Sequence, residues 1–68
     1  HLQTNFYEYI NRYRVSAVQE AIRRGDAERY TLLAIALDCG FSSKSSFNRI
    51  FKQHSGQTPT AFKKGFDT

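Results

Sequence analysis

The sequence predicts an all-α fold, in which one long helix precedes three short ones. No stretch of any length alternates apolar and polar residues with a period of two, which argues against strands. The single proline and the four glycines fall between segments with helical periodicity. At 68 residues the chain is one domain with a thin core. The all-α fold class therefore follows from the helical periodicity and from the positions of proline and glycine between the helical segments.

The first predicted helix begins after the N-cap Asn5 and runs to about Arg24. Glu8 stands at the third helical position, where it completes a capping box with Asn5, and Gly25 ends the helix. At 100° per residue its apolar side chains form two stripes. One stripe contains Phe6, Tyr9, Ile10, Tyr13, Ala17 and Ala21, and the opposite one contains Val15, Val18 and Ile22. A helix with two apolar faces needs two packing partners, and we expect the rest of the chain to provide only one of them.

The second predicted helix follows a loop at residues 25–30. Thr31 caps this helix, which runs through Asp38 and is ended by Gly40. Four of its residues share the face that we expect to be buried: Leu32, Ile35, Ala36 and Cys39. Leu33 and Leu37 extend the apolar surface sideways, and we expect them to pack against the first helix.

The third and fourth predicted helices also have N-cap residues. Ser43 caps a helix over 44–54, which Gly56 ends. Thr58 precedes a proline at the first helical position, so a last helix is expected over 59–64. The small Ala36 and the glycine at residue 40 let the second and third helices approach closely around a bend. Two short helices joined in this way form a helix-turn-helix, whose second helix lies in the DNA major groove.

The predicted third helix divides into a buried and a polar side. The buried stripe contains Phe47, Ile50, Phe51 and His54. The opposite side is centred on Ser45, Asn48, Arg49 and Lys52, with Lys44 and Ser46 on its flanks. Arg49 suits guanine, Asn48 suits adenine or a phosphate, and Lys44 suits guanine or the backbone. The alternative interpretation is an ordinary solvated helix face, which carries the same residue types.

The distribution of charge along the chain favours a DNA-contacting helix over an ordinary solvated one. The chain has ten Lys and Arg against six Asp and Glu, a net charge of +4. Residues 1–39 contain five arginines and five acids, which cancel, whereas residues 40–68 contain five cations and only Asp67. The net charge therefore lies in the half that contains the polar helix, and this distribution favours a polyanionic partner.

Other chemistry is not indicated. No Ser-His-Asp set, glycine-rich phosphate loop or paired carboxylate is present, so we expect no enzyme and no cofactor. Cys39 lies on a buried stripe, where packing is favoured over nucleophilic chemistry, and His54 has no Cys or His at metal-ligand spacing. The apolar run "LLAIAL" is too short to span a bilayer, and the chain does not open with a signal sequence. With a single cysteine, we expect a cytoplasmic setting.

The stretch "LLAIALDCGFSSKSSFNRIFKQHSGQTPTAFKK" resembles the C-terminal signature of the AraC/XylS family of bacterial transcription regulators. The matching places are Ile35-Ala36, Gly40-Phe41, Ser45, Phe47, Phe51-Lys52, Gly56, Thr58-Pro59 and Phe62-Lys63. Upstream, "FYEYINRYRV" resembles the linker helix of that family. The resemblance implies sequence-specific binding of double-stranded DNA by a homeodomain-like three-helix unit. It also makes RNA polymerase a possible partner, and a protein-interaction module is the alternative function.

The resemblance also implies site residues and a domain organisation. The DNA-contacting positions of the family are occupied by Ser43, Lys44, Ser45, Ser46, Asn48 and Arg49, and Thr31 at a helix N-terminus suits a phosphate. Residues 1–24 would be the linker helix and the tail of a truncated first unit, and residues 25–68 the second unit. The stripe of Phe6, Tyr9, Ile10 and Tyr13 would have packed on the first unit. We expect the fragment to bury that stripe by self-association.

Overall fold

The computed structural model describes residues 6–67, and this part of the chain is all helical. Its elements are α1 (Phe6–Arg23), the 3-10 turn η2 (Asp26–Glu28), α2 (Leu32–Asp38), α3 (Lys44–Ser55) and α4 (Pro59–Asp67). The all-α prediction is confirmed. The predicted capping box depends on Asn5, which lies outside the described residues. Of the helices described, none combines the length and the apolar character needed to cross a bilayer.

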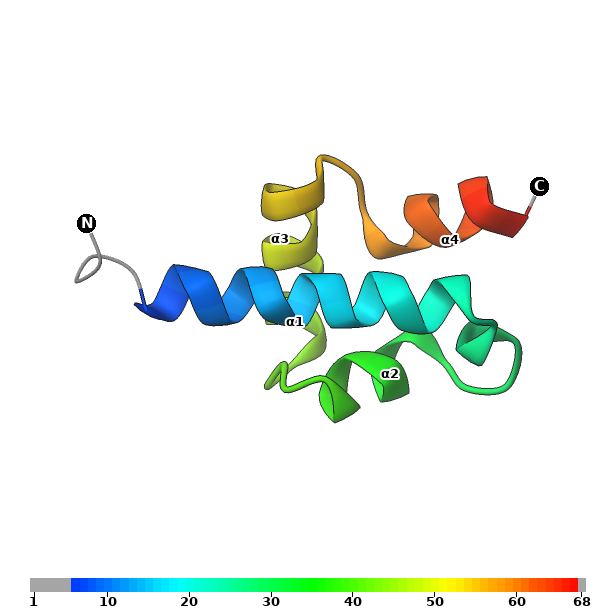
Figure 1. Ribbon diagram of the computed structural model, residues 1–68, viewed down its shortest axis with the longest axis horizontal. Helices are drawn as coiled ribbons and strands as arrows, with labels where there is room; N and C mark the ends of the chain where they lie inside the picture. Colours follow the sequence, from blue (N-terminus) through cyan, green and yellow to red (C-terminus); the bar gives the residue numbers. More distant parts are fainter. Residues whose placement is uncertain (1–5, 68) are drawn as a thin grey trace.

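The long helix α1 organises the molecule. Figure 1 shows α1 along the length of the structure, with α2 and α4 on two sides of it and α3 crossing behind it. All three contact α1, and α3 also contacts α2 and α4. The short helices thus pack on α1 and on one another, which is the arrangement expected of a compact helix-turn-helix unit.

The core is built from one face of each of the first three helices. Its buried side chains are Val15, Val18, Ala21, Ile22, Ile35, Ala36, Phe41, Phe47, Ile50 and Phe51. The stripe of Val15, Val18 and Ile22 is therefore the apolar face of α1 that packs in the core. Ala21 stands on the same stripe as Tyr9 and Tyr13, but it is only 3% exposed. It lies near the C-terminal end of α1, where η2 and α2 fold against the helix and cover its small methyl group.

The outer stripe of α1 is exposed near the N-terminal end of the helix. Phe6, Tyr9 and Tyr13 are 74%, 62% and 63% exposed, and Ile10 is half-buried. The described part of the chain therefore provides a packing partner for only one of the two apolar faces, as the sequence predicts.

The bend between α2 and α3 is a Schellman motif. The Gly40 N–H donates to the carbonyl of Leu37 at 3.1 Å, and the Phe41 N–H donates to that of Ala36 at 3.0 Å. Gly40 has φ +109°, which residues with a Cβ rarely adopt. A Cβ there would also lie 2.9 Å from Nε of Arg14, whose Nη1 donates to the buried Asn11 Oδ1 at 3.3 Å. The tight bend is thus packed against α1.

Several predicted boundaries change. Both α1 and α3 end within one residue of the prediction, and η2 gives the predicted loop a helical turn. The last helix continues three residues beyond Lys64. Gly65 does not have positive φ, and Phe66 stacks on Phe62 with ring centroids 6.3 Å apart, a contact one helical turn along that favours continuation.

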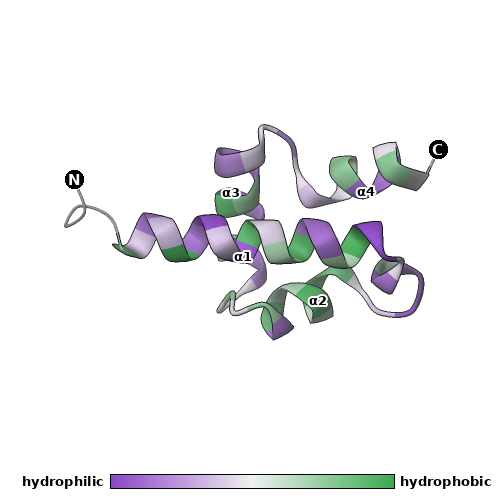
Figure 2. Ribbon diagram, in the orientation of Figure 1, coloured by the Kyte–Doolittle hydropathy of each residue, from purple (hydrophilic) through white to green (hydrophobic). Residues whose placement is uncertain are grey.

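The prediction that Leu33 and Leu37 pack on the first helix is wrong. They are 37% and 50% exposed. Figure 2 shows α2 hydrophobic over most of its length. A helix of seven residues has room for one buried face, and Ile35 and Ala36 occupy it, so the leucines on its other sides remain in solvent.

Candidate nucleic-acid interface

The start and end of α3 are fixed by local contacts that the sequence specifies. The Ser43 Oγ accepts a hydrogen bond from the Ser46 N–H at 3.1 Å, which satisfies one of the unpaired donors of the first turn. At the other end Gly56 adopts φ +85° and its N–H donates to the Lys52 carbonyl at 2.9 Å. These caps define a rigid helix of 12 residues.

The rotation of α3 about its axis is fixed by aromatic packing. Phe47, Ile50 and Phe51 are at most 3% exposed. Phe47 contacts Phe41 and Phe51, with ring centroids 5.2 and 5.8 Å apart, and Phe51 meets Phe62 of α4 edge-on at 5.8 Å. Because such pairs prefer tilted geometries and dense packing, α3 cannot turn without losing them. The opposite side of α3 must therefore face solvent.

The side chains predicted to read DNA lie on that solvent side. Ser45, Asn48, Arg49 and Lys52 are all exposed and, with Gln53 and Thr58, line one shallow depression. We call Ser45, Asn48, Arg49, Lys52 and Gln53 the α3 outer face. Lys44 is exposed at the first position of the helix, whereas Ser46 is half-buried. The structure thus brings together the four central residues of the predicted surface.

Gln53 was missed by the sequence reasoning. It stands four residues after Arg49 and five after Asn48, so the helical period places it on the same face. Gln can form two hydrogen bonds with adenine, as Asn can. Extending the polar stripe by one turn would have identified it.

The first turns of two other helices flank the start of α3. Leu32 and Leu33 of α2 and Pro59 and Thr60 of α4 line a small pocket together with Lys44, Phe47 and Asn48 of α3. Thr31 is exposed immediately before α2, and its Oγ1 accepts from the Ala34 N–H at 3.0 Å. Thr58 caps α4 in the same way, from the Ala61 N–H at 3.1 Å. Helix N-termini, with their partial positive charge, therefore border the outer face.

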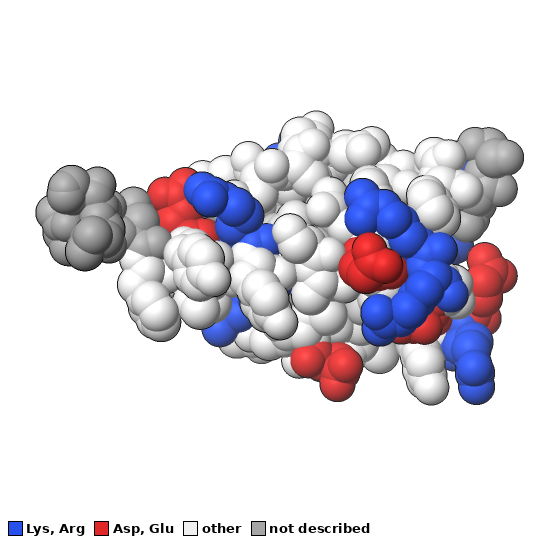
Figure 3. Space-filling model, viewed as in Figure 1, with Lys and Arg blue, Asp and Glu red and all other residues white. Residues whose placement is uncertain are grey.

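Charges on the molecule are arranged unevenly. The view in Figure 3 shows cations and carboxylates side by side near the C-terminal end of α1, where Arg23 pairs with Glu20 and Arg24 with Asp26. On α3, by contrast, no ion pair joins Lys44, Arg49 or Lys52 to a carboxylate in the described residues. These three cations remain available to an external anion.

Cys39 and His54 lie outside the α3 outer face, and their surroundings do not favour a reactive thiol or a metal site. Cys39 packs partly buried against the core, and its pKa is raised, chiefly by burial and then by the neighbouring Asp38 carboxylate. A thiol with a raised pKa is a poor nucleophile at neutral pH. His54 is half-buried in the last turn of α3, and residues 6–67 contain no group of three His, Cys, Asp or Glu that could hold a metal ion.

Comparison with known proteins decides the family. A family model described as a helix-turn-helix domain matches residues 1–65, nearly the whole chain. The chain belongs to the AraC/XylS family. This AraC-type domain is 38% identical over 56 residues to a probable transcription factor, PqrA, of Proteus vulgaris. That alignment covers 82% of the chain but 43% of the relative. No solved structure matches the AraC-type domain at a significant level.

Proposed function

We propose that the chain binds double-stranded DNA sequence-specifically, with α3 in the major groove and its outer face toward the base edges. The observation that carries this proposal is the division of α3 into two sides. The side with Phe47, Ile50 and Phe51 is held in the core, and the other presents only polar and cationic side chains. A major groove about 12 Å wide admits a helix that is anchored in this way.

Most residues of the outer face, and those at the start of α3, have roles that their chemistry supports. Arg49 offers the planar donor pair that matches O6 and N7 of guanine, and Asn48 matches N6 and N7 of adenine. Lys52 and Lys44 neutralise phosphates on either side of the groove, while Ser45 is short enough to let the helix lie deep. Ser43 and Ser46 form the cap of α3, and the Ser43 hydroxyl proton remains available to a phosphate because the Ser43 oxygen only accepts the Ser46 N–H.

The flanking helix starts hold the DNA backbone in this proposal. The Thr31 oxygen accepts one hydrogen bond, which leaves its hydroxyl proton free to be donated to a phosphate oxygen. Thr58 before α4 has the same arrangement. Phosphates on either side of α3 would thus meet a threonine hydroxyl and the positive end of a helix.

Family membership supports an assignment of domain roles. We assign residues 25–68 as a helix-turn-helix unit and α1 as the linker helix that precedes it. The relative from Proteus vulgaris is a probable transcription factor, and the chain spans less than half of it. The protein would accordingly regulate transcription, in the bacterial cytoplasm where the DNA lies.

Selection from a random DNA library, followed by binding at several salt concentrations, tests the proposal. We expect an enriched motif and a selected site bound at least about tenfold more tightly than random DNA, because one good bidentate base contact is worth about 1–3 kcal/mol. Both affinities should fall as salt rises. No enrichment, with equal and salt-dependent binding to all sequences, would reduce the function to non-specific DNA binding and contradict the proposal.

The alternative, a protein-interaction module that uses α3 to contact polymerase or another regulator, has only Arg49 as a candidate anchor among the described residues of the α3 outer face. Protein interfaces depend on a few buried aromatic, arginine or large apolar side chains at their centre. Among the described residues the exposed side of α3 holds no aromatic or aliphatic side chain. Absence of any DNA binding in the selection experiment would favour this alternative.

A further inference from the structure

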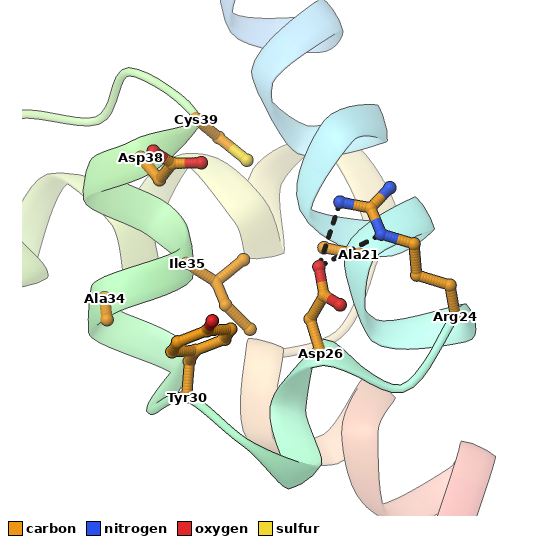
Figure 4. A pocket seen from close by; sticks show the side chains of 8 residues that line it. All are labelled: Ala21, Arg24, Asp26, Tyr30, Ala34, Ile35, Asp38 and Cys39. Carbon is orange, nitrogen blue, oxygen red and sulfur yellow. Dashed lines mark hydrogen bonds and ion pairs between the residues drawn. The ribbon is translucent and has the colours of Figure 1, made fainter.

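A second hollow lies away from the outer face of α3. It has a volume of about 390 Å³ and lies between the C-terminal end of α1, the turn η2 and helix α2. Figure 4 shows its eight lining side chains: Ala21, Arg24, Asp26, Tyr30, Ala34, Ile35, Asp38 and Cys39. Small-molecule sites in proteins typically have volumes of about 300–1,000 Å³. The hollow is thus large enough for a small ligand, and DNA reading by α3 does not use it.

The inner surface of this hollow is apolar. Ala21 and Ile35 are 3% and 5% exposed and belong to the core, so they form a fixed floor. Tyr30 is 56% exposed, and Figure 4 shows its ring on the α2 side of the hollow, next to Ile35. The half-buried thiol of Cys39 points into the hollow from the end of α2. A flat apolar group can therefore be covered on two sides.

The ionised side chains that line the hollow, Arg24, Asp26 and Asp38, sum to one negative charge, although the chain carries +4 overall and Arg29 lies over the Tyr30 ring at 6.0 Å. Arg24 is neutralised by Asp26, with Nη2 and Nε 2.9 and 3.0 Å from Oδ2. The Asp38 carboxylate is exposed at the rim and has no ion pair within residues 6–67. The raised pKa of Cys39 agrees with this sign, because after burial the largest effect on the thiol is that of Asp38. One uncompensated carboxylate therefore lies at the rim of a hollow with an apolar floor.

We propose that this hollow is a binding site for a small organic cation, with a flat apolar body between Tyr30 and the Ala21–Ile35 floor and a protonated nitrogen beside Asp38. The apolar body gains from leaving water. A carboxylate ligand of the same shape is repelled by Asp38. The selectivity of the site is thus for amines or amidines over neutral and anionic analogues.

The thiol of Cys39 provides a direct measurement. Because it is the single cysteine of the chain, its rate of alkylation by iodoacetamide reports whether the hollow is occupied. The probes are phenethylamine, its neutral analogue 2-phenylethanol and the anion 3-phenylpropionate, at equal ionic strength. We expect phenethylamine to slow the alkylation saturably, the neutral analogue to do so more weakly and the anion not at all. Equal protection by all three probes, or protection by none, would overturn the proposal.

Two variants distinguish the contribution of charge to ligand binding from that of the shape of the hollow. Asp38→Asn should weaken phenethylamine by about fivefold, the value of a largely exposed ion pair, and leave 2-phenylethanol unchanged. Glu28→Gln is the matched control, since it removes one nearby carboxylate that does not line the hollow. Ala34→Leu, an exposed lining residue, should weaken both probes by filling space. Unfolding midpoints in urea show that each variant is folded. Equal phenethylamine binding by wild type and Asp38→Asn would contradict the role of Asp38.

Discussion

At the scale of single residues, the two central cations of the α3 outer face are expected to contact different parts of the DNA. Arg49 lies at the centre of the face and Lys52 one turn toward the C-terminal end of the helix. A guanidinium that reads guanine discriminates between base pairs, whereas an ammonium on a phosphate contributes equally to every sequence. Specificity and salt dependence can therefore be assigned to separate side chains.

Arg49→Ala should cost about 1–3 kcal/mol on the selected DNA site and relax specificity at one base pair. Lys52→Ala should weaken all sequences about equally and reduce the slope of log affinity against log salt by about 0.9. Fluorescence anisotropy on the selected site and its single-base variants distinguishes the two effects. Arg29→Ala removes an exposed cation near η2 and should leave base preference unchanged. Uniform loss from Arg49→Ala would instead make Arg49 a phosphate contact.

Gly40 contributes to stability through its backbone conformation, which forms the bend between α2 and α3. Gly40→Ala places a Cβ at φ +109° and within 2.9 Å of the Arg14 side chain. We expect a loss of about 1–2 kcal/mol in the free energy of unfolding, measured by urea denaturation, because a left-handed conformation is costly for residues with a Cβ.

Gly65→Ala is the matched control for the bend. Residue 65 lies within α4, does not have positive φ, and an added Cβ would meet no atom within 4 Å. Alanine there should therefore raise the free energy of unfolding by about 0.5–1 kcal/mol. If both alanines changed stability in the same direction, the bend at Gly40 would not be the constraint described above.

At the scale of elements, α3 depends on its first turn. Ser43→Ala removes the acceptor of the Ser46 N–H and should destabilise the domain by about 0.5–2 kcal/mol. Ser43→Asp restores an acceptor and should recover most of that stability. Thermal unfolding followed by circular dichroism measures both variants. Identical midpoints for wild type and Ser43→Ala would show that the cap contributes nothing to folding.

Most elements were predictable because their ends carry local signals. The caps Thr31, Ser43 and Thr58 and the glycines at positions 40 and 56 act through neighbours within a few residues, and the structure shows the expected hydrogen bonds. The buried stripe of α3 was predictable for a similar reason, because helical periodicity alone sets it.

What the sequence did not predict depends on contacts between distant segments or on competition between signals. Helical periodicity places Ala21 on the same stripe as the exposed Tyr9 and Tyr13, and Ala21 is buried because η2 and α2 fold over it. Leu33 and Leu37 are exposed because α2 has only one covered side. The end of α4 was predicted three residues too early, and the stacking of Phe62 and Phe66 favours the longer helix. Each of these features depends on a contact between side chains or segments that helical periodicity alone does not predict.

At the scale of the whole molecule, the exposed stripe of α1 is the feature that the described fold does not cover. Its aromatic members, Phe6, Tyr9 and Tyr13, lie on the side of α1 away from the core. Glu8 and Arg12, on one flank of the stripe, have no ion pair within residues 6–67. In an antiparallel pair of α1 helices, Glu8 of each copy approaches Arg12 of the other. Such a pairing is self-complementary, as a two-fold interface requires.

We therefore expect the chain to self-associate through this stripe, with both α3 outer faces left open. Tyr9→Glu places a carboxylate within the stripe and should shift the monomer–dimer equilibrium toward monomer by at least about tenfold, because it buries an unpaired charge. Tyr30→Glu is the matched control, since Tyr30 is a similarly exposed tyrosine near η2. Sedimentation velocity over a range of concentrations measures the equilibrium. A wild-type chain that sediments as a monomer up to millimolar concentration would show that a second copy does not cover the stripe.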